Sequence, residues 1–230
     1  VVLISHNHYD HMDEYSLQAL QNANPDMQVL VPYGDKAWFI KRNFSHVQEY
    51  SWWQRHMILS DDQSIACTFL PAHHWSQRTL FDRNQTLWGS WMIEGGGSTV
   101  YFAGDTAYGP HFRNIAYHFP DIDIALMPVA PTEPRSWMRY SHILPEQTIE
   151  AFLELGASHF IPMHWGTFWF GTEPPLDGIR DLHNAWQHNS NRLAHAQLHM
   201  LRFGQSCYRD KADNACYMVG DSVSPSLTRE

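Results

Sequence analysis

The stretch "SHNHYDHMD", residues 5–13, directly follows an apolar run over residues 1–4 that is typical of a buried strand. Five of its nine residues are histidine or aspartate: His6, His8, Asp10, His11 and Asp13. Side chains this polar are costly to crowd together at a protein interior unless partners satisfy them. Metal ions would do so, and the stretch therefore predicts a metal site where a buried strand ends.

Further ligands are expected at the ends of other strands, because one loop cannot surround an ion. Three more apolar runs end in suitable residues: "FLPAHHW" at His73 and His74, "VYFAGDT" at Asp105 and "FIPMHWG" at His164. In layered α/β proteins, sites assemble where the carboxyl ends of strands converge. Each residue alone fits an ordinary structural role, but four such strand ends together indicate one site.

Residue spacing divides the expected ligands between two ions. His6 and His8 lie two positions apart, so in extended backbone their side chains point the same way and bind one ion. Asp10 and His11 follow where the chain turns, and we expect them to face a second ion. One histidine of the 73–74 pair completes the first set, and strand alternation alone does not choose which.

The second set is completed by His164, and Asp105 is the natural carboxylate bridge between the two ions. Imidazole and carboxylate donors without thiolates suit zinc, with iron or manganese as alternatives. Two such ions, about 3.5–4 Å apart, hold a hydroxide and stabilise both the attacking and the leaving oxygen, which predicts hydrolysis. Two roles stay open for Asp13: the N-cap of a helix, or a hydrogen-bond partner of a metal-bound histidine.

The composition favours a small or lipidic substrate over nucleic acid. The chain has 230 residues, 43% of them hydrophobic, and a formal net charge of -9 with only 15 Lys and Arg, so a basic surface that follows phosphates is not expected. Cys67, Cys207 and Cys216 are too few and too scattered for a disulfide framework or a CxxC metal site. No run approaches the roughly 18 apolar residues of a membrane span.

Alternating strand and helix patterns predict an α/β layered protein. "IEGGGST" at 93–99 indicates an antiparallel hairpin, so the sheet is expected to be mixed. We expect a metallo-hydrolase domain over residues 1–204 and a polar, loosely held tail over 205–230. Helices are expected over residues 13–22, 35–42, 145–156 and 177–188, and strands over 1–5, 28–32, 65–70, 86–93, 99–103, 122–129, 159–163 and 198–203.

The motif HxHxDH, here "HNHYDH", with the later His, Asp and His, resembles the signature of the metallo-β-lactamase superfamily. That resemblance implies an αββα sandwich with a dinuclear site at one edge, whose first strands would precede Val1.

Longer blocks resemble the N-acylphosphatidylethanolamine-hydrolysing phospholipase D family, including its bacterial relatives. They are "HNHYDHMD", "HHWSQRTLFDRNQTLWGSW", "FAGDTAYGP", "EPRSWMRYSHILPE" and "HWGTFWFGTEPP". The resemblance implies that His74, not His73, is the ligand. It also implies a functional role for His142, with Asp10 and Asp105 as the other catalytic residues and two zinc ions held by His6, His8, Asp10, His11, His74, Asp105 and His164.

The family resemblance implies that a metal-bridging hydroxide cleaves a phosphodiester bond, releasing phosphatidic acid and an N-acylethanolamine. His142 is expected to orient the substrate or to donate a proton to the leaving oxygen. A histidine satisfied within its own turn is the other interpretation. A cation beside apolar surface suits a lipid phosphate, and this combination occurs at Arg135, Trp137 and Met138. The same residues also fit the start of an ordinary surface helix.

Two further functions stay open from the sequence. One is a lactonase acting on a sugar-phosphate lactone, since the same dinuclear centre can attack a carbonyl. The other is a non-catalytic, membrane-associated metal-binding module. The expected location is cytoplasmic, with peripheral membrane contact through aromatic side chains.

Overall fold

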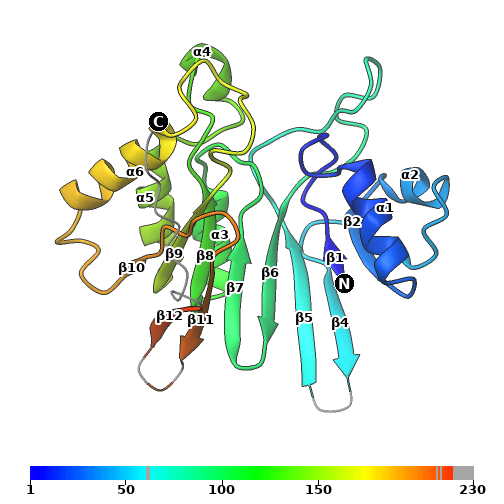
Figure 1. The fold of residues 1–230 in the computed structure, drawn as a ribbon, viewed down its shortest axis with the longest axis horizontal. Helices are drawn as coiled ribbons and strands as arrows, with labels where there is room; N and C mark the ends of the chain where they lie inside the picture. Colours follow the sequence, from blue (N-terminus) through cyan, green and yellow to red (C-terminus); the bar gives the residue numbers. More distant parts are fainter. Residues whose placement is uncertain (61–62, 211, 213, 220–230) are drawn as a thin grey trace, which may run out of the picture.

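The computed structural model describes residues 1–60, 63–210, 212 and 214–219, and contains two packed sheets (Figure 1). The small sheet is parallel throughout, in the order β1-β2-β3. Helices α1 and α2 connect its strands. The bounds are β1 (Val2–Leu3), α1 (Glu14–Ala23), β2 (Val29–Pro32), α2 (Lys36–Ile40) and β3 (Val47–Tyr50).

The large sheet has the order β10-β9-β8-β7-β6-β5-β4 and is mixed, as the sequence predicts. Its β4–β7 half is antiparallel and its β7–β10 half is parallel. The strands are β4 (Arg55–Ser60), β5 (Gln63–Leu70), β6 (Ser90–Gly95), β7 (Ser98–Phe102), β8 (Ile124–Pro128), β9 (His159–Met163) and β10 (Gln197–Leu198). The remaining helices are α3 (His111–His118), α4 (Arg135–Met138), α5 (Pro145–Leu155) and α6 (Asp177–His188).

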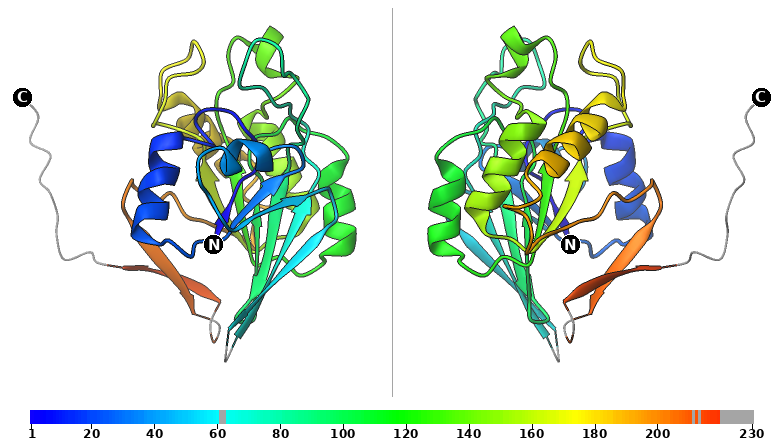
Figure 2. Two further views of the ribbon diagram at one scale, coloured as in Figure 1. Left: turned by 90° about the vertical axis from the view of Figure 1, so that its right-hand side faces the viewer. Right: turned by 90° about the vertical axis from the view of Figure 1, so that its left-hand side faces the viewer.

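Helices cover the outer face of each sheet, which confirms the expected αββα sandwich (Figure 2). One apolar cluster, including Leu17, Val29 and Phe39, lies between the small sheet and its helices. A larger one lies between the large sheet and α3, α5 and α6. A third cluster, with Phe69 and Trp91, fills the space between the two sheets. Trp91 Nε1 donates to the Ile4 carbonyl at 2.9 Å and ties β6 to the end of β1.

The helix ends follow the sequence signals. Asp13 is the N-cap of α1, because its carboxylate accepts the Ser16 amide hydrogen at 2.8 Å. Pro145 occupies the first turn of α5, and Gly156 ends that helix with φ of +68°, a backbone conformation that favours glycine. The interpretation of Asp13 as a helix cap is therefore confirmed.

The polar stretch from residue 205 differs from the expected loose tail. Residues in it form an antiparallel hairpin of β11 (Ser206–Asp210) and β12 (Ala215–Val219), in which Tyr208 stacks on Tyr217. Arg209 pairs with Asp123 at 2.7 Å and holds the hairpin against the start of β8. Cross-strand pairing and the Arg209 ion pair hold residues 206–210 and 215–219 in this hairpin. The expected tail over 220–230 lies outside the described residues, and the division at residue 204 stays a prediction.

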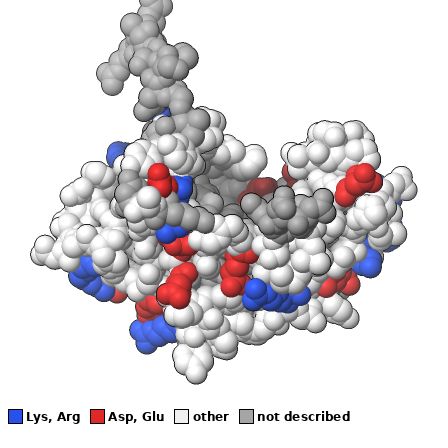
Figure 3. Space-filling model, turned by 90° about the horizontal axis from the view of Figure 1, so that it is seen from below, with Lys and Arg blue, Asp and Glu red and all other residues white. Residues whose placement is uncertain are grey.

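The helices and the surface opposite the predicted ligands bear on whether the protein binds a membrane or nucleic acid. Among the described residues, no helix is long and apolar enough to cross a membrane. Seen from below, at the end of the sheet opposite the predicted ligands, Lys and Arg side chains are interspersed with Asp and Glu (Figure 3).

Candidate metal centre

The predicted ligands meet at one edge of the sandwich, in the loops that follow β1, β5, β7 and β9 (Figure 1). The close approach of these loops explains Gly104, the residue before Asp105. Its φ is +60°, and a Cβ there would lie 2.8 Å from Ser5 Cβ and 2.9 Å from the Gly89 carbonyl oxygen. A larger residue would separate Asp105 from the histidine loop.

The first group of potential ligands is His6, His8, His74 and Asp105, whose ligand atoms all lie within 4.8 Å of one another. Nδ1 of His8 lies 2.9 Å from Nε2 of His6 and 3.2 Å from Nε2 of His74. Three imidazole nitrogens thus converge on one point. This is the set predicted for the first ion, and it includes His74 rather than His73.

The second group is Asp10, His11, Asp105 and His164, gathered within the same limit. His11 Nε2 lies 3.0 Å from Asp10 Oδ2 and 3.3 Å from Asp105 Oδ1. His164 Nε2 lies 3.2 Å from His11 Nε2. The side chains predicted for the second ion are therefore also together.

Hydrogen bonds on the far side of the rings fix which nitrogens face inward. Nδ1–H of His74 donates to the Ser141 carbonyl at 2.8 Å, and Nδ1–H of His164 donates to the Ala130 carbonyl at 2.7 Å. Each ring therefore turns Nε2 toward the cluster, the nitrogen through which it would bind a metal.

The protonation states also fit metal binding. Burial lowers the pKa of His74 to about 3, so its ring is neutral at pH 7. Burial alone would raise the pKa of Asp105, but His164 and His11 hold it well below its usual range, so the carboxylate is ionised. Oδ1 of Asp105 is buried without a conventional hydrogen-bond partner among the described residues. At the second group burial would lower the histidine pKa values, but Asp105 and Asp10 raise the pKa of His11 to about 10 and raise that of His164. A divalent cation would displace these protons, because imidazole ligands bind metal in the deprotonated form.

A family model described as the β-lactamase superfamily domain matches residues 1–165. The chain belongs to the β-lactamase superfamily. The match spans all seven predicted ligands, from the His6 loop to His164.

Two curated relatives within this superfamily share 32% identity with the chain. N-acyl-phosphatidylethanolamine-hydrolyzing phospholipase D 1 of Caenorhabditis elegans aligns over 193 residues, 80% of this chain and 54% of the relative. The mitochondrial N-acyl-phosphatidylethanolamine-hydrolyzing phospholipase D of Saccharomyces cerevisiae aligns over 171 residues, 73% of this chain and 36% of the relative. The chain thus spans about half or less of the length of these relatives, and the similarity predicted from its sequence blocks is confirmed.

A solved member of the fold confirms the architecture. Igni18, a metallo hydrolase from the archaeon Ignicoccus hospitalis, superposes with a TM-score of 0.61 at 19% identity, covering 87% of this chain and 75% of that one. At this identity the likeness shows the fold alone. The chain therefore has the metallo-β-lactamase fold that its sequence predicts.

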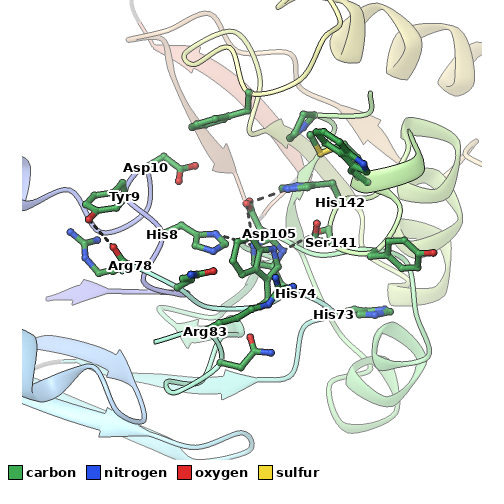
Figure 4. Close-up of a pocket in the computed structure, with 18 of the residues that line it drawn as sticks. His8, Tyr9, Asp10, His73, His74, Arg78, Arg83, Asp105, Ser141 and His142 are labelled. Carbon is green, nitrogen blue, oxygen red and sulfur yellow. Dashed lines mark hydrogen bonds and ion pairs between the residues drawn. The ribbon is translucent and has the colours of Figure 1, made fainter. Parts of the chain in front are cut away.

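His142 lies beside the two ligand groups without belonging to either. Its Nδ1 lies 4.0 Å from Asp105 Oδ2 and has no hydrogen-bond partner among the described residues (Figure 4). The ring packs near His74 and His164, with centroids 5.2 and 5.8 Å away. Burial lowers the pKa of His142 to about 4. An unpaired ring nitrogen that points at the centre is suited to contact a bound substrate.

A cavity of about 1100 Å³ opens from the metal centre. Trp137 and Met138 line it, as the sequence interpretation requires. Arg135 does not line it, because its guanidinium points behind the site and donates to the His142 carbonyl at 3.0 Å and to Gln147 Oε1 at 3.1 Å. The structure therefore places Arg135 where it positions the His142 loop, and not where we expected it to contact substrate.

Two arginines that sequence reasoning missed do line the cavity, Arg78 and Arg83. Arg78 donates to the carbonyls of Asn7 and Met12 at 3.0 and 2.9 Å and so holds the ligand loop closed. Its guanidinium also lies over the Tyr9 ring. Both arginines belong to the block "HHWSQRTLFDRNQTLWGSW", and membership of that block was the sequence signal that could have found them.

His73 points away from the cluster, and its amide donates to Thr106 Oγ1 at 2.9 Å (Figure 4).

Proposed function

We propose that this protein is a dinuclear metal-dependent hydrolase that cleaves a phosphodiester bond of an N-acylphosphatidylethanolamine-type phospholipid, with phospholipase D regiochemistry. The observation that carries the proposal is the position of Asp105, which belongs to both ligand groups at the base of a large cavity. Similarity to the two phospholipase D relatives supports the choice of substrate.

The residues fit two divalent cations. His6, His8, His74 and Asp105 would hold one, and Asp10, His11, His164 and the same Asp105 would hold the other. Imidazole and carboxylate ligands favour zinc, with iron and manganese as the alternatives that metal analysis separates. When bound, such a pair supplies Lewis acidity, which lowers the pKa of water and neutralises charge on a phosphate.

His142 is proposed to serve the leaving group. Its Nδ1 faces the Asp105 carboxylate across 4.0 Å, at the boundary between the ligand groups and the cavity. A substrate phosphate held at the ligand groups would bring an oxygen within reach of this nitrogen. The Arg135 bond to the His142 carbonyl keeps the loop, and therefore the ring, in place.

The rim of the cavity is proposed to contact a lipid surface. Large apolar side chains project from three segments around the mouth: Leu80 and Phe81 (86% and 87% exposed), Trp137 (74%) and Trp169 (69%). Figure 1 shows α4 and the loop between β5 and β6 at the same end of the molecule. A cluster of exposed apolar side chains is unfavourable in water. Such a cluster suits the membrane–water interface, where aromatic rings insert among the lipid headgroups.

The test is a substrate panel with the metal-loaded full chain: bis-p-nitrophenyl phosphate, N-acylphosphatidylethanolamine vesicles and a set of lactones. We expect diester and lipid turnover that a chelator abolishes and added zinc restores. Lactone turnover without diester turnover would replace the proposal with a lactonase. Full metal occupancy with no turnover of any substrate would replace it with a binding module.

A further inference from the structure

The hairpin of β11 and β12 brings two thiols into contact, although their positions in the sequence gave no sign of pairing. Sγ of Cys216 lies 2.8 Å from Sγ of Cys207. In the strand register, Cys207 is opposite Met218 and Cys216 is opposite Arg209, so the two cysteines are diagonal neighbours on one face of the hairpin.

Contacts with the body of the protein hold the hairpin in this register. Arg209 pairs with Asp123 at 2.7 Å and also donates to Asn214 Oδ1 at 2.8 Å. The Asn214 side chain lies 3.1 Å from Nε2 of His159 in β9. Because β11 and the residue that leads into β12 are both anchored, the two sulfur atoms are kept together, which a free hairpin would not ensure.

The third cysteine has a different environment. Cys67 lies in β5, buried between the two sheets with Phe69 and Trp91. Cys207 and Cys216 are only half-buried, so a small reagent in solution can reach them. The chain therefore contains one enclosed thiol and one accessible pair.

We infer that Cys207 and Cys216 form a thiol–disulfide modification site, which a small disulfide oxidant such as oxidised glutathione converts to an intrachain disulfide. A disulfide needs the two sulfurs to meet with little movement of the backbone, and the contact between them meets that need. Nothing in this site overlaps the metal centre, because the hairpin packs at the opposite end of the large sheet (Figure 1).

The chemistry balances in two exchange steps. The Cys216 thiol donates its hydrogen bond to Cys207, and burial together with this bond raises the pKa of Cys216, which disfavours Cys216 as the first nucleophile. The Cys207 thiolate attacks oxidised glutathione and releases one glutathione. Cys216 then attacks the mixed disulfide at the Cys207 sulfur and releases the second. The protons of both protein thiols end on the two glutathione molecules.

The experiment treats the metal-loaded full chain with oxidised glutathione, blocks remaining thiols, and measures intact mass, free thiols in denaturant and linked peptides. We expect free thiols to fall from three to one, with a peptide that links residues 207 and 216. Three free thiols, a link through Cys67, or a covalent dimer on a non-reducing gel would overturn the inference.

Matched variants separate the pair from the third thiol. Cys67→Ser should still lose two thiols on oxidation, whereas Cys207→Ser should form no intrachain link. The thermal unfolding midpoint should rise on oxidation in the unmodified chain and in Cys67→Ser, and should not change in Cys207→Ser. If all three proteins lost the same number of thiols on oxidation, the result would contradict a specific site. This comparison holds even if a variant is less stable than the unmodified chain.

Discussion

Oδ1 of Asp105 lies 3.1 Å from Nε2 of His164. The ring donates its Nδ1–H to the Ala130 carbonyl, so Nε2 is the atom that faces the carboxylate. Burial would lower the pKa of His164, but the Asp105 carboxylate raises it. A ring nitrogen and a carboxylate oxygen this close need a positive charge between them, which a proton or a metal ion supplies. His74 repeats the arrangement at 3.7 Å from the other oxygen, Oδ2. Asp105 is therefore the residue through which two cations would be joined.

Replacing this carboxylate should disable both ion sites. We expect Asp105→Asn to retain less than two metal ions per chain and to lose diester turnover by on the order of 10²-fold or more. Metal analysis and the bis-p-nitrophenyl phosphate assay check this. Asp121→Asn, at an exposed position, is the matched control and should behave as the unmodified protein. Full turnover by Asp105→Asn would refute the bridging role.

His142 should be needed for turnover but not for metal binding. His142→Gln is expected to keep two ions and to lower kcat by roughly 10²-fold, because the substrate loses the ring that orients it. The exposed His183→Gln serves as control. Loss of a metal ion in His142→Gln would instead make this histidine a ligand.

Lipid contact at the rim can be separated from chemistry. Phe81 and Trp169 are exposed and lie outside the lining of the large cavity. The double variant Phe81→Ala/Trp169→Ala should bind phospholipid vesicles about 10-fold more weakly, because roughly 1.4 kcal/mol of apolar burial is lost. Turnover of the soluble diester should stay unchanged. Tyr117→Ala removes an equally exposed ring on α3 and should leave vesicle binding intact; equal losses in both variants would speak against a defined rim.

Asp35 predicts a pH dependence of stability. Burial raises its pKa to about 7, against 3.8 for the free side chain, and only Oδ1 is paired, with the Asn7 amide at 3.2 Å and the Thr86 hydroxyl nearby. The folded protein thus binds this proton more tightly than the unfolded chain. Stability from this group is complete below pH 4 and falls, by about 4 kcal/mol at most, as the pH rises through 7.

The corresponding variant is Asp35→Asn, which cannot ionise. Urea unfolding between pH 5 and pH 8 should show a flatter stability profile than that of the unmodified protein, and greater stability at pH 8. Asp26→Asn, at an exposed position, is the control. Parallel profiles for Asp35→Asn and the unmodified protein would show that the buried carboxyl does not set this dependence.

The ligand set was predictable because metal binding constrains spacing strongly. His6 and His8 share a direction only if the backbone is extended, and Asp105 and His164 each end an apolar strand. Residue spacing alone could not decide whether His73 or His74 faces the ligand group. The choice depends on the Ser141 carbonyl, which comes from a distant loop and orients one ring.

Two strands that sequence reasoning missed, β3 and β11, lack the apolar runs that mark a strand. β3 is "VQEY", with both central residues polar, and β11 alternates half-buried and exposed positions. Pairing with neighbours, not side-chain hydrophobicity, determines these strands. The sequence does not orient Arg135 either, since a cation beside apolar residues looks the same in sequence whether it faces substrate or the carbonyl of His142.

Crystals grown with zinc, measured at the zinc absorption edge, test the central claim most directly. A dinuclear centre joined by Asp105 predicts two anomalous peaks, one among His6, His8 and His74 and one among Asp10, His11 and His164. Both should lie within about 2.0–2.2 Å of an oxygen of Asp105. A single peak, or zinc bound away from that carboxylate, would contradict it.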